Sequence, residues 1–122
     1  MSPTQRTLAW LRERHYTAAV VEHWNPHARR RVDLFGCLDI LALDGEVGVL
    51  GIQVTTTSNL AARYRKIREE CAIVMREWLD CRNRLQIHGW SKKGARGTRK
   101  LWTLTVRELS LADLDGATPK AP

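Results

Sequence analysis

The amino-acid sequence predicts an α/β fold in which helices cover both faces of a mixed sheet, giving three layers. Short apolar segments rich in β-branched residues alternate with two segments of helical periodicity. The pair Asp44-Gly45 separates two of the apolar segments, as in a hairpin. The longer helical segment follows this hairpin and precedes two more strand-like segments, which is the order of a crossover connection. We therefore expect helix, three-stranded meander, helix, strand and strand.

The N-terminal part of the chain predicts one helix and one strand. Residues 3–15 carry apolar side chains at helical spacing among charged ones, and Ser2 with Pro3 supplies a cap and a first-turn proline. Residues 17–24 are apolar and β-branched, which indicates a strand that ends before an Asn-Pro pair. The arginine-rich residues 26–31 follow as a loop.

Residues 32–43 and 47–55 are predicted to form the two strands of the hairpin. Both segments are apolar over most of their length, as expected of strands that are covered on both faces. Gly36 interrupts the first of them and predicts a bend or a bulge there.

The rest of the chain predicts one long helix and two strands. Residues 59–82 should form a single helix capped by Ser58 and Asn59, because apolar residues recur at every third or fourth position. Residues 84–90 and 101–108 have strand character. The predicted buried stripe of the helix consists of Leu60, Tyr64, Ile67, Cys71, Val74, Met75 and Trp78.

The composition indicates one domain with a basic surface. The chain has 122 residues, with 20 Lys and Arg against 13 Asp and Glu, and a formal net charge of +7. We assign residues 1–112 to the domain and residues 113–122 to a flexible tail. Three cysteines without a C-x-x-C pair predict reduced thiols, not a disulfide framework or a zinc site. No stretch is apolar enough for a membrane span or a signal peptide, so we expect a cytoplasmic protein.

Polar side chains interrupt the hairpin strands at positions that face each other. Alternate residues of a strand share a face, so Gln53 and Thr55 lie together, and a turn at Asp44-Gly45 brings Asp39 opposite them. Burying a carboxylate without compensation costs several kcal/mol, and an oxygen-ligated divalent cation would compensate. The alternative is that Asp39 accepts from a nearby backbone group and that Gln53 is a hydrogen-bonded core amide.

These residues and the order of elements resemble the PD-(D/E)XK nuclease superfamily, over about residues 3–106. The similarity is greatest to small archaeal-type Holliday-junction resolvases and related phage nucleases. It implies an α/β three-layer mixed sheet with an αβββαβ(β) restriction-endonuclease-like core, and metal-dependent hydrolysis of DNA. The resemblance makes Asp39 the second-strand aspartate and Gln53 the third-strand Glu or Gln. Thr55 stands where the family has a lysine.

Lys66 is the candidate for that missing lysine. It lies seven residues after Asn59, close to two helical turns, so the two residues share a face of the helix. In the family, the lysine orients or activates the attacking water and stabilises charge on the phosphate. The alternatives are a solvated helix charge at Lys66 and a site that has lost catalysis but still binds nucleic acid.

The remaining ligands are sought among nearby carboxylates. Glu22, near the end of the first strand, is the first candidate for the family's other acidic residue, and Glu13 is the second. Asp33 is either a further ligand or a partner of the neighbouring arginines. Such a site suits Mg²⁺ or Mn²⁺, which keep several waters and need few carboxylates. The predicted ligands are Asp39, Gln53, the Val54 carbonyl, Glu22 and Asp33.

A chain this basic is expected to bind nucleic acid, with phosphate contacts from its arginines and lysines. The loop 91–100 contains two glycines and suits shape recognition of DNA, unless it only keeps the protein soluble. Trp24, Trp90 and Trp102 either stack on bases or belong to the core or a dimer interface. The predicted nucleic-acid-binding residues are Arg29, Arg30, Arg31, Asn59, Arg63, Lys92, Lys93, Arg96, Arg99 and Lys100.

Three classes of function remain open from the sequence. The first is a small metal-dependent DNA endonuclease, acting on branched DNA as a homodimer, in the nucleoid or encoded by a phage or mobile element. The second is a nuclease-fold module that binds nucleic acid without cutting it. The third is an interaction subunit of a larger assembly, with exposed tryptophans for protein contacts.

Overall fold

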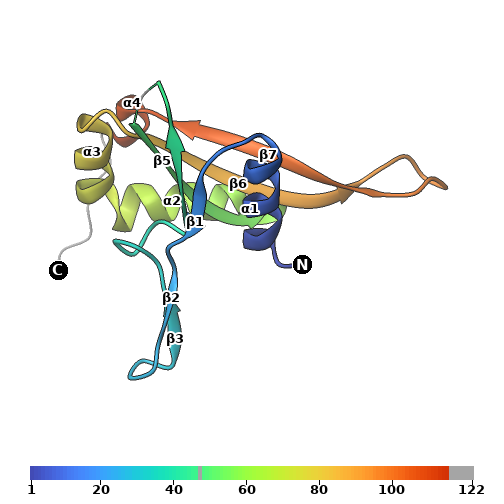
Figure 1. Ribbon diagram of the computed structural model, residues 1–122, viewed down its shortest axis with the longest axis horizontal. Coiled ribbons are helices and arrows are strands. Elements are labelled where there is room, and N and C mark those ends of the chain that lie inside the picture. Colours follow the sequence, from blue (N-terminus) through green and yellow to red (C-terminus); the bar gives the residue numbers. More distant parts are fainter. Residues whose placement is uncertain (47, 116–122) are drawn as a thin grey trace.

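The computed structural model describes residues 1–46 and 48–115 and shows an α/β fold with a mixed five-stranded sheet (Figure 1). The strands are β1 (Ala18–Val20), β2 (His23–Asn25), β3 (Arg30–Val32), β4 (Ile40–Asp44), β5 (Gly48–Thr56), β6 (Arg84–Lys93) and β7 (Leu101–Leu109). The main sheet has the order β1-β4-β5-β6-β7, in which β5 and β6 are parallel and the other neighbours antiparallel. β2 and β3 form a separate two-stranded sheet.

Helices cover both faces of the main sheet, as predicted. They are α1 (Pro3–Glu13), α2 (Leu60–Glu70), α3 (Ala72–Asp80) and α4 (Leu111–Leu114), and a 3-10 turn (Thr57–Asn59) precedes α2. On one face, Leu11 of α1 is buried with Ile40 and Ile52 of the sheet. On the other, Ile67 of α2 and Met75 of α3 are buried. The mixed sheet therefore lies between two apolar clusters.

The hairpin predicted at Asp44-Gly45 is present and sets the register that the site depends on. Asp44 pairs with Gly48 and Ile40 pairs with Ile52, so Asp39 falls opposite Gln53 by continuation of the ladder. The first helix begins as expected, since Ser2 accepts a hydrogen bond from the Gln5 N–H at 3.1 Å.

The two strands predicted at residues 17–24 and 32–43 are each divided, and this corrects the sequence prediction. Residues 18–20 pair with β4, whereas 23–25 pair with 30–32 in a hairpin that projects from the body of the protein (Figure 1). The predicted bend falls at Gly36, in a turn with φ +72°. Strand pairing is decided by the partner segment, which apolar periodicity alone does not identify.

The long helix predicted over residues 59–82 is also divided. It breaks at Cys71 into α2 and α3, and neither Ser58 nor Asn59 makes the predicted capping hydrogen bond. Cys71 is joined to Cys37 in a disulfide, so the prediction of reduced thiols is wrong for these two cysteines and holds for Cys81. The number of cysteines does not show which two of them form a disulfide. The pairing depends on the tertiary structure, which places the turn before β4 next to the break between α2 and α3.

Reduction of the disulfide is expected to lower the free energy of unfolding by about 3–4 kcal/mol, because the bond closes a loop with a sequence separation of 34 residues. Urea denaturation with and without dithiothreitol measures this difference. Cys71→Ser should show the lower stability in both conditions, and Cys81→Ser should respond to the reductant as the wild type does. Identical curves for the oxidised and reduced wild type would contradict the expectation.

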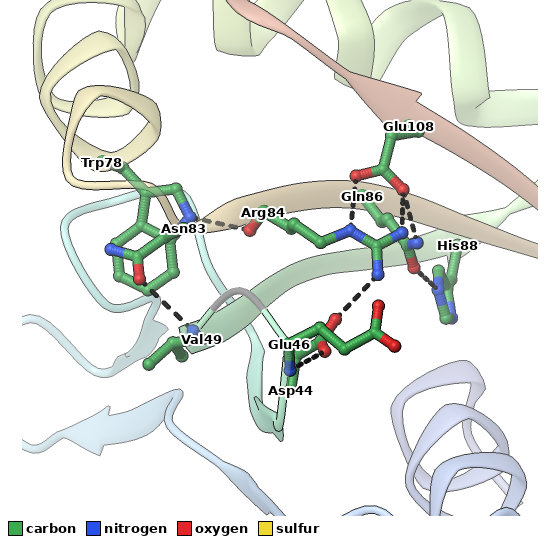
Figure 2. Close-up of polar contacts among 9 residues, drawn as sticks. All are labelled: Asp44, Glu46, Val49, Trp78, Asn83, Arg84, Gln86, His88 and Glu108. Carbon is green, nitrogen blue, oxygen red and sulfur yellow. Dashed lines mark hydrogen bonds and ion pairs between the residues drawn. The ribbon is translucent and has the colours of Figure 1, made fainter.

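A chain of polar contacts ties three strands together on the α1 face (Figure 2). Arg84 donates to Asp44 at 2.8 Å and to Glu108 at 2.6 and 3.1 Å, which joins β6 to β4 and β7. Gln86 donates to Glu108 at 2.8 Å, and its carbonyl oxygen lies 2.8 Å from His88 Nε2. These contacts fix the edge strand β7 against the centre of the sheet.

His88 makes stability depend on pH at the acidic side. It is fully buried, and burial lowers its pKa from 6.5 to about 4. The pKa of His88 is lower in the folded state than in the unfolded state. Its contribution to the free energy of unfolding is therefore complete above pH 6.5 and is lost as the pH falls through 4. In urea titrations over this window, we expect the unfolding free energy of the wild type to fall by about 3 kcal/mol relative to that of His88→Gln, and the exposed-site control His15→Gln to follow the wild type. Parallel profiles for wild type and His88→Gln would contradict this assignment.

The C-terminal segment contains a further element. Asp113 and Leu114, which the sequence assigns to the tail, belong to α4, where Asp113 accepts from the Ser110 N–H at 2.7 Å. Residues 116–122 of the predicted tail lie outside the described residues. Within the described part of the chain, the helices are all too short or too polar to cross a membrane.

Candidate metal centre

Three carboxylates converge at one edge of the sheet. Glu22 follows β1, Asp33 follows β3, and Asp39 precedes β4, so each sits where a strand joins an irregular segment. One oxygen of each side chain lies within 4.8 Å of one oxygen of both others. The division of both predicted strands creates the site. The projecting hairpin β2–β3 pairs His23 with Val32, so Glu22 and Asp33 lie next to each other at its base.

Asp39 is the buried member of this cluster, with 5% of its surface exposed. Its Oδ2 accepts a hydrogen bond of 2.7 Å from the Val54 N–H, which favours the charged form. Desolvation outweighs that bond and, with the neighbouring Asp33 and Glu22, raises the pKa of Asp39 from 3.8 to about 8. Without a cation, this carboxyl group therefore holds its proton at neutral pH.

Gln53 supplies an amide with an unsatisfied oxygen. The side chain is 1% exposed, and its Nε2 donates to Asp33 Oδ2 at 3.5 Å, which places the amide at the cluster. Its Oε1 is buried and accepts no hydrogen bond from the described residues. A buried acceptor without a partner costs about 1–3 kcal/mol, so this atom lacks a partner that a cation or its water would supply.

Two basic side chains border the carboxylates. Lys66 Nζ lies 3.8 Å from Asp33 Oδ2, and Arg31 lies 3.9 Å from Glu22 Oε1. Both distances are at the long end for ion pairs, so Lys66 and Arg31 only partly neutralise the negative charge of the carboxylates. The site consequently presents carboxylate oxygens, an amide oxygen and two cations in one place.

The structure brings together most of the residues that the sequence selected. Asp39, Gln53, Glu22, Asp33 and Lys66 meet at the cluster. Asp33 is paired with Lys66, so the alternative pairing of Asp33 with the arginines is wrong, and Arg31 approaches Glu22 instead. That contact was missed because it depends on the β2–β3 pairing.

Val54, Thr55 and Glu13 do not make the contacts that the sequence predicts for them. The Val54 contact is through its N–H, so the predicted role of its carbonyl as a ligand is not the contact that the structure shows. Thr55 is buried on the Gln53 face of β5, and none of the hydrogen bonds of the described cluster involves it. Glu13 is exposed on α1, which covers the opposite face of the sheet, so Glu22 and not Glu13 joins the site.

The donor set fits a hard divalent cation. All of the candidate ligand atoms are carboxylate or amide oxygens, the donors that Mg²⁺ and Mn²⁺ prefer, and histidine and cysteine are not in the cluster. Three carboxylates this close repel one another when ionised, and a divalent cation would remove that repulsion. The buried Oε1 of Gln53, which accepts no hydrogen bond from the described residues, is an independent observation that favours a cation at this position.

The predicted nucleic-acid-binding residues lie in three groups. Arg29, Arg30 and Arg31 are exposed on the β2–β3 hairpin. Asn59 and Arg63 precede Lys66 at helical spacing on α2 and its 3-10 turn. The third group is exposed on the long β6–β7 hairpin, which extends beyond the body of the protein (Figure 1): Lys92, Lys93, Arg96, Arg99 and Lys100.

Comparison of the chain with protein-family models, with curated proteins and with solved structures finds no match.

Proposed function

We propose that this protein is a metal-dependent endonuclease that hydrolyses phosphodiester bonds in DNA. The observation that carries the proposal is the buried carboxyl group of Asp39, with a pKa raised to about 8, beside two further carboxylates and an amide oxygen that has no hydrogen-bond partner. Such a cluster is costly in a protein fold unless a cation occupies it. The net charge of +7 supports a polyanion as substrate.

The order of elements supports a restriction-endonuclease-like core as part of this proposal. A helix, an antiparallel run of β1, β4 and β5, a helical crossover and the parallel strand β6 follow one another. Asp39 directly precedes the second of these main-sheet strands, and Gln53 lies on the third. This is the arrangement that the resemblance to PD-(D/E)XK nucleases implies.

The residues of the chain have separate roles in the proposed reaction. Asp39, Asp33 and Glu22, with Gln53 Oε1, would hold Mg²⁺ or Mn²⁺. The ion supplies a water of lowered pKa and neutralises charge on the phosphate. Lys66, held 3.8 Å from Asp33, supplies a positive charge that faces the same position from α2.

The basic hairpins would hold the DNA on either side of this centre. A homodimer would double the phosphate contacts of this small chain and set two cuts, which suits branched DNA such as a Holliday junction. A cytoplasmic location is part of this proposal, because it would give the protein access to DNA. The dimer and the branched substrate rest on the resemblance and on this count of contacts.

The test is cleavage of supercoiled plasmid, linear duplex and a four-way junction by the full chain. We expect cleavage with Mg²⁺ or Mn²⁺ and none with EDTA. A protein that binds these substrates and leaves them intact under both metals would overturn the enzyme and favour the second candidate, a module that binds without cutting. The observation in favour of that candidate is Thr55, which is buried where the family has its lysine.

Lys66→Gln is expected to lower the cleavage rate about 100-fold, because it removes one positive group from the position of the developing phosphate charge. Lys66→Arg should retain part of the activity, since it keeps the charge. Arg65→Gln is the matched control, because Arg65 is an exposed cation one residue away on α2 and belongs to no described ion pair. Equal losses in Lys66→Gln and Arg65→Gln would mean that only general charge matters.

A further inference from the structure

A second feature lies on the α1 face of the sheet, opposite the carboxylate cluster. A pocket of about 320 Å³ is lined by residues of α1, β6 and β7. Three tryptophans line it: Trp10 from α1, Trp90 from β6 and Trp102 from β7. None of the residues proposed to bind metal lines this pocket.

The tryptophan rings differ in how firmly they are held. Trp90 is 7% exposed, and its indole N–H donates to Thr7 Oγ1 at 2.8 Å, so this ring is fixed in the wall. Trp102 is 44% exposed and lies directly across from Lys92 in the β6–β7 ladder. The pocket therefore offers one fixed aromatic surface and one that is open to solvent.

Two cations are held against the exposed ring. The guanidinium carbon of Arg6 lies 3.7 Å from the centroid of Trp102, and Lys92 Nζ lies 5.4 Å from it. Within residues 1–46 and 48–115, neither cation is ion-paired with a carboxylate, and the buried Arg6 Nε has no hydrogen-bond partner. Their positive charge is placed beside aromatic surface and remains available to an anionic ligand.

We propose that this pocket binds an unpaired nucleobase of single-stranded DNA or RNA, with Arg6 and Lys92 on the adjoining phosphates. Indole rings stack on any base, and cations bind the backbone, which together are the means by which proteins hold single strands. The pocket volume suits one base with part of its sugar. The strand continues along the exposed cations of the hairpin, Lys93, Arg96, Arg99 and Lys100. This site needs no metal and does not depend on the proposed cleavage.

The test compares two fluorescein-labelled 12-residue oligonucleotides in EDTA by fluorescence anisotropy. One is oligo(dT), and the other has the same phosphates with abasic residues throughout. We expect the full chain to bind oligo(dT) at least about tenfold more tightly than the abasic strand, because stacking requires the base. Equal affinities would overturn the proposal, since phosphate contacts alone would then account for binding.

Variants assign the preference to this pocket. Trp102→Ala should remove the preference for oligo(dT), whereas Trp102→Phe should retain most of it; thermal melts verify that both variants are folded. Lys93→Gln is the charge control, because its side chain lies on the opposite face of β6 from Lys92. It should weaken binding of both strands by the same factor. A preference that survives Trp102→Ala would place the bases elsewhere and overturn the proposal.

Discussion

Asp39→Asn is expected to lower metal-dependent cleavage at least about 1000-fold while the protein stays folded. Asparagine has the same size and can still accept from the Val54 N–H, so the local hydrogen bond of 2.7 Å is retained. It cannot provide the negative charge that holds a divalent cation among Glu22 and Asp33. The cleavage rate in Mg²⁺ measures the loss, and DNA binding in EDTA should be unchanged or slightly stronger.

Two controls accompany this variant. Asp80→Asn removes an exposed carboxylate at the end of α3 and should cleave at the wild-type rate. Addition of Mg²⁺ should raise the melting temperature of the wild type and of Asp80→Asn but not that of Asp39→Asn, because only the intact cluster binds the ion in the folded state. Wild-type cleavage by Asp39→Asn would show that the reaction occurs at another site.

The same substitution is expected to stabilise the protein when no metal is present. The folded-state pKa of Asp39 is about 8 against 3.8 ordinarily, so the unfolded chain ionises first as the pH rises. The contribution of Asp39 to the free energy of unfolding is complete below pH 3.8 and is lost as the pH rises through 8. Each unit of pKa corresponds to about 1.4 kcal/mol, so at pH 8 and above Asp39→Asn should exceed the wild type by on the order of 6 kcal/mol in unfolding free energy.

Urea denaturation in EDTA at pH 4, 6, 8 and 9 measures this difference. It should be small at pH 4, grow through pH 6 and become constant above pH 8. His88 titrates in both proteins and cancels in the comparison. A wild type that is more stable than Asp39→Asn at pH 9 would show that Asp39 carries its charge without cost, and no cation would then be needed to offset that charge.

Local features of the sequence were sufficient for the centre of the site. The Asp44-Gly45 turn, the period of two along a strand and the spacing of Asp39 and Gln53 together predicted that these two side chains meet. The ladder places the two residues opposite each other beyond the Ile40–Ile52 pair, and Gln53 donates to Asp33, which lies in the cluster with Asp39. Helical spacing predicted only that Lys66 shares a face of the helix with Asn59, and in the structure Lys66 Nζ lies 3.8 Å from Asp33 of the cluster.

Long-range contacts decided the rest. Nothing local in residues 17–24 or 32–43 showed that each segment would be shared between two sheets, yet this division is what brings Glu22 and Asp33 to Asp39. The Cys37–Cys71 bond and the break in the helix depend in the same way on segments distant in sequence.

What the sequence alone determined is therefore the set of elements with short-range causes: a capped first helix, one hairpin, and a polar pair on facing strands. Only the tertiary structure decided which segments pair, which carboxylates complete the cluster, and where three tryptophans enclose a pocket. The physical reason is that turn geometry and side-chain periodicity act over a few residues. Pairing and burial instead depend on the free energy of contacts between residues far apart in the chain.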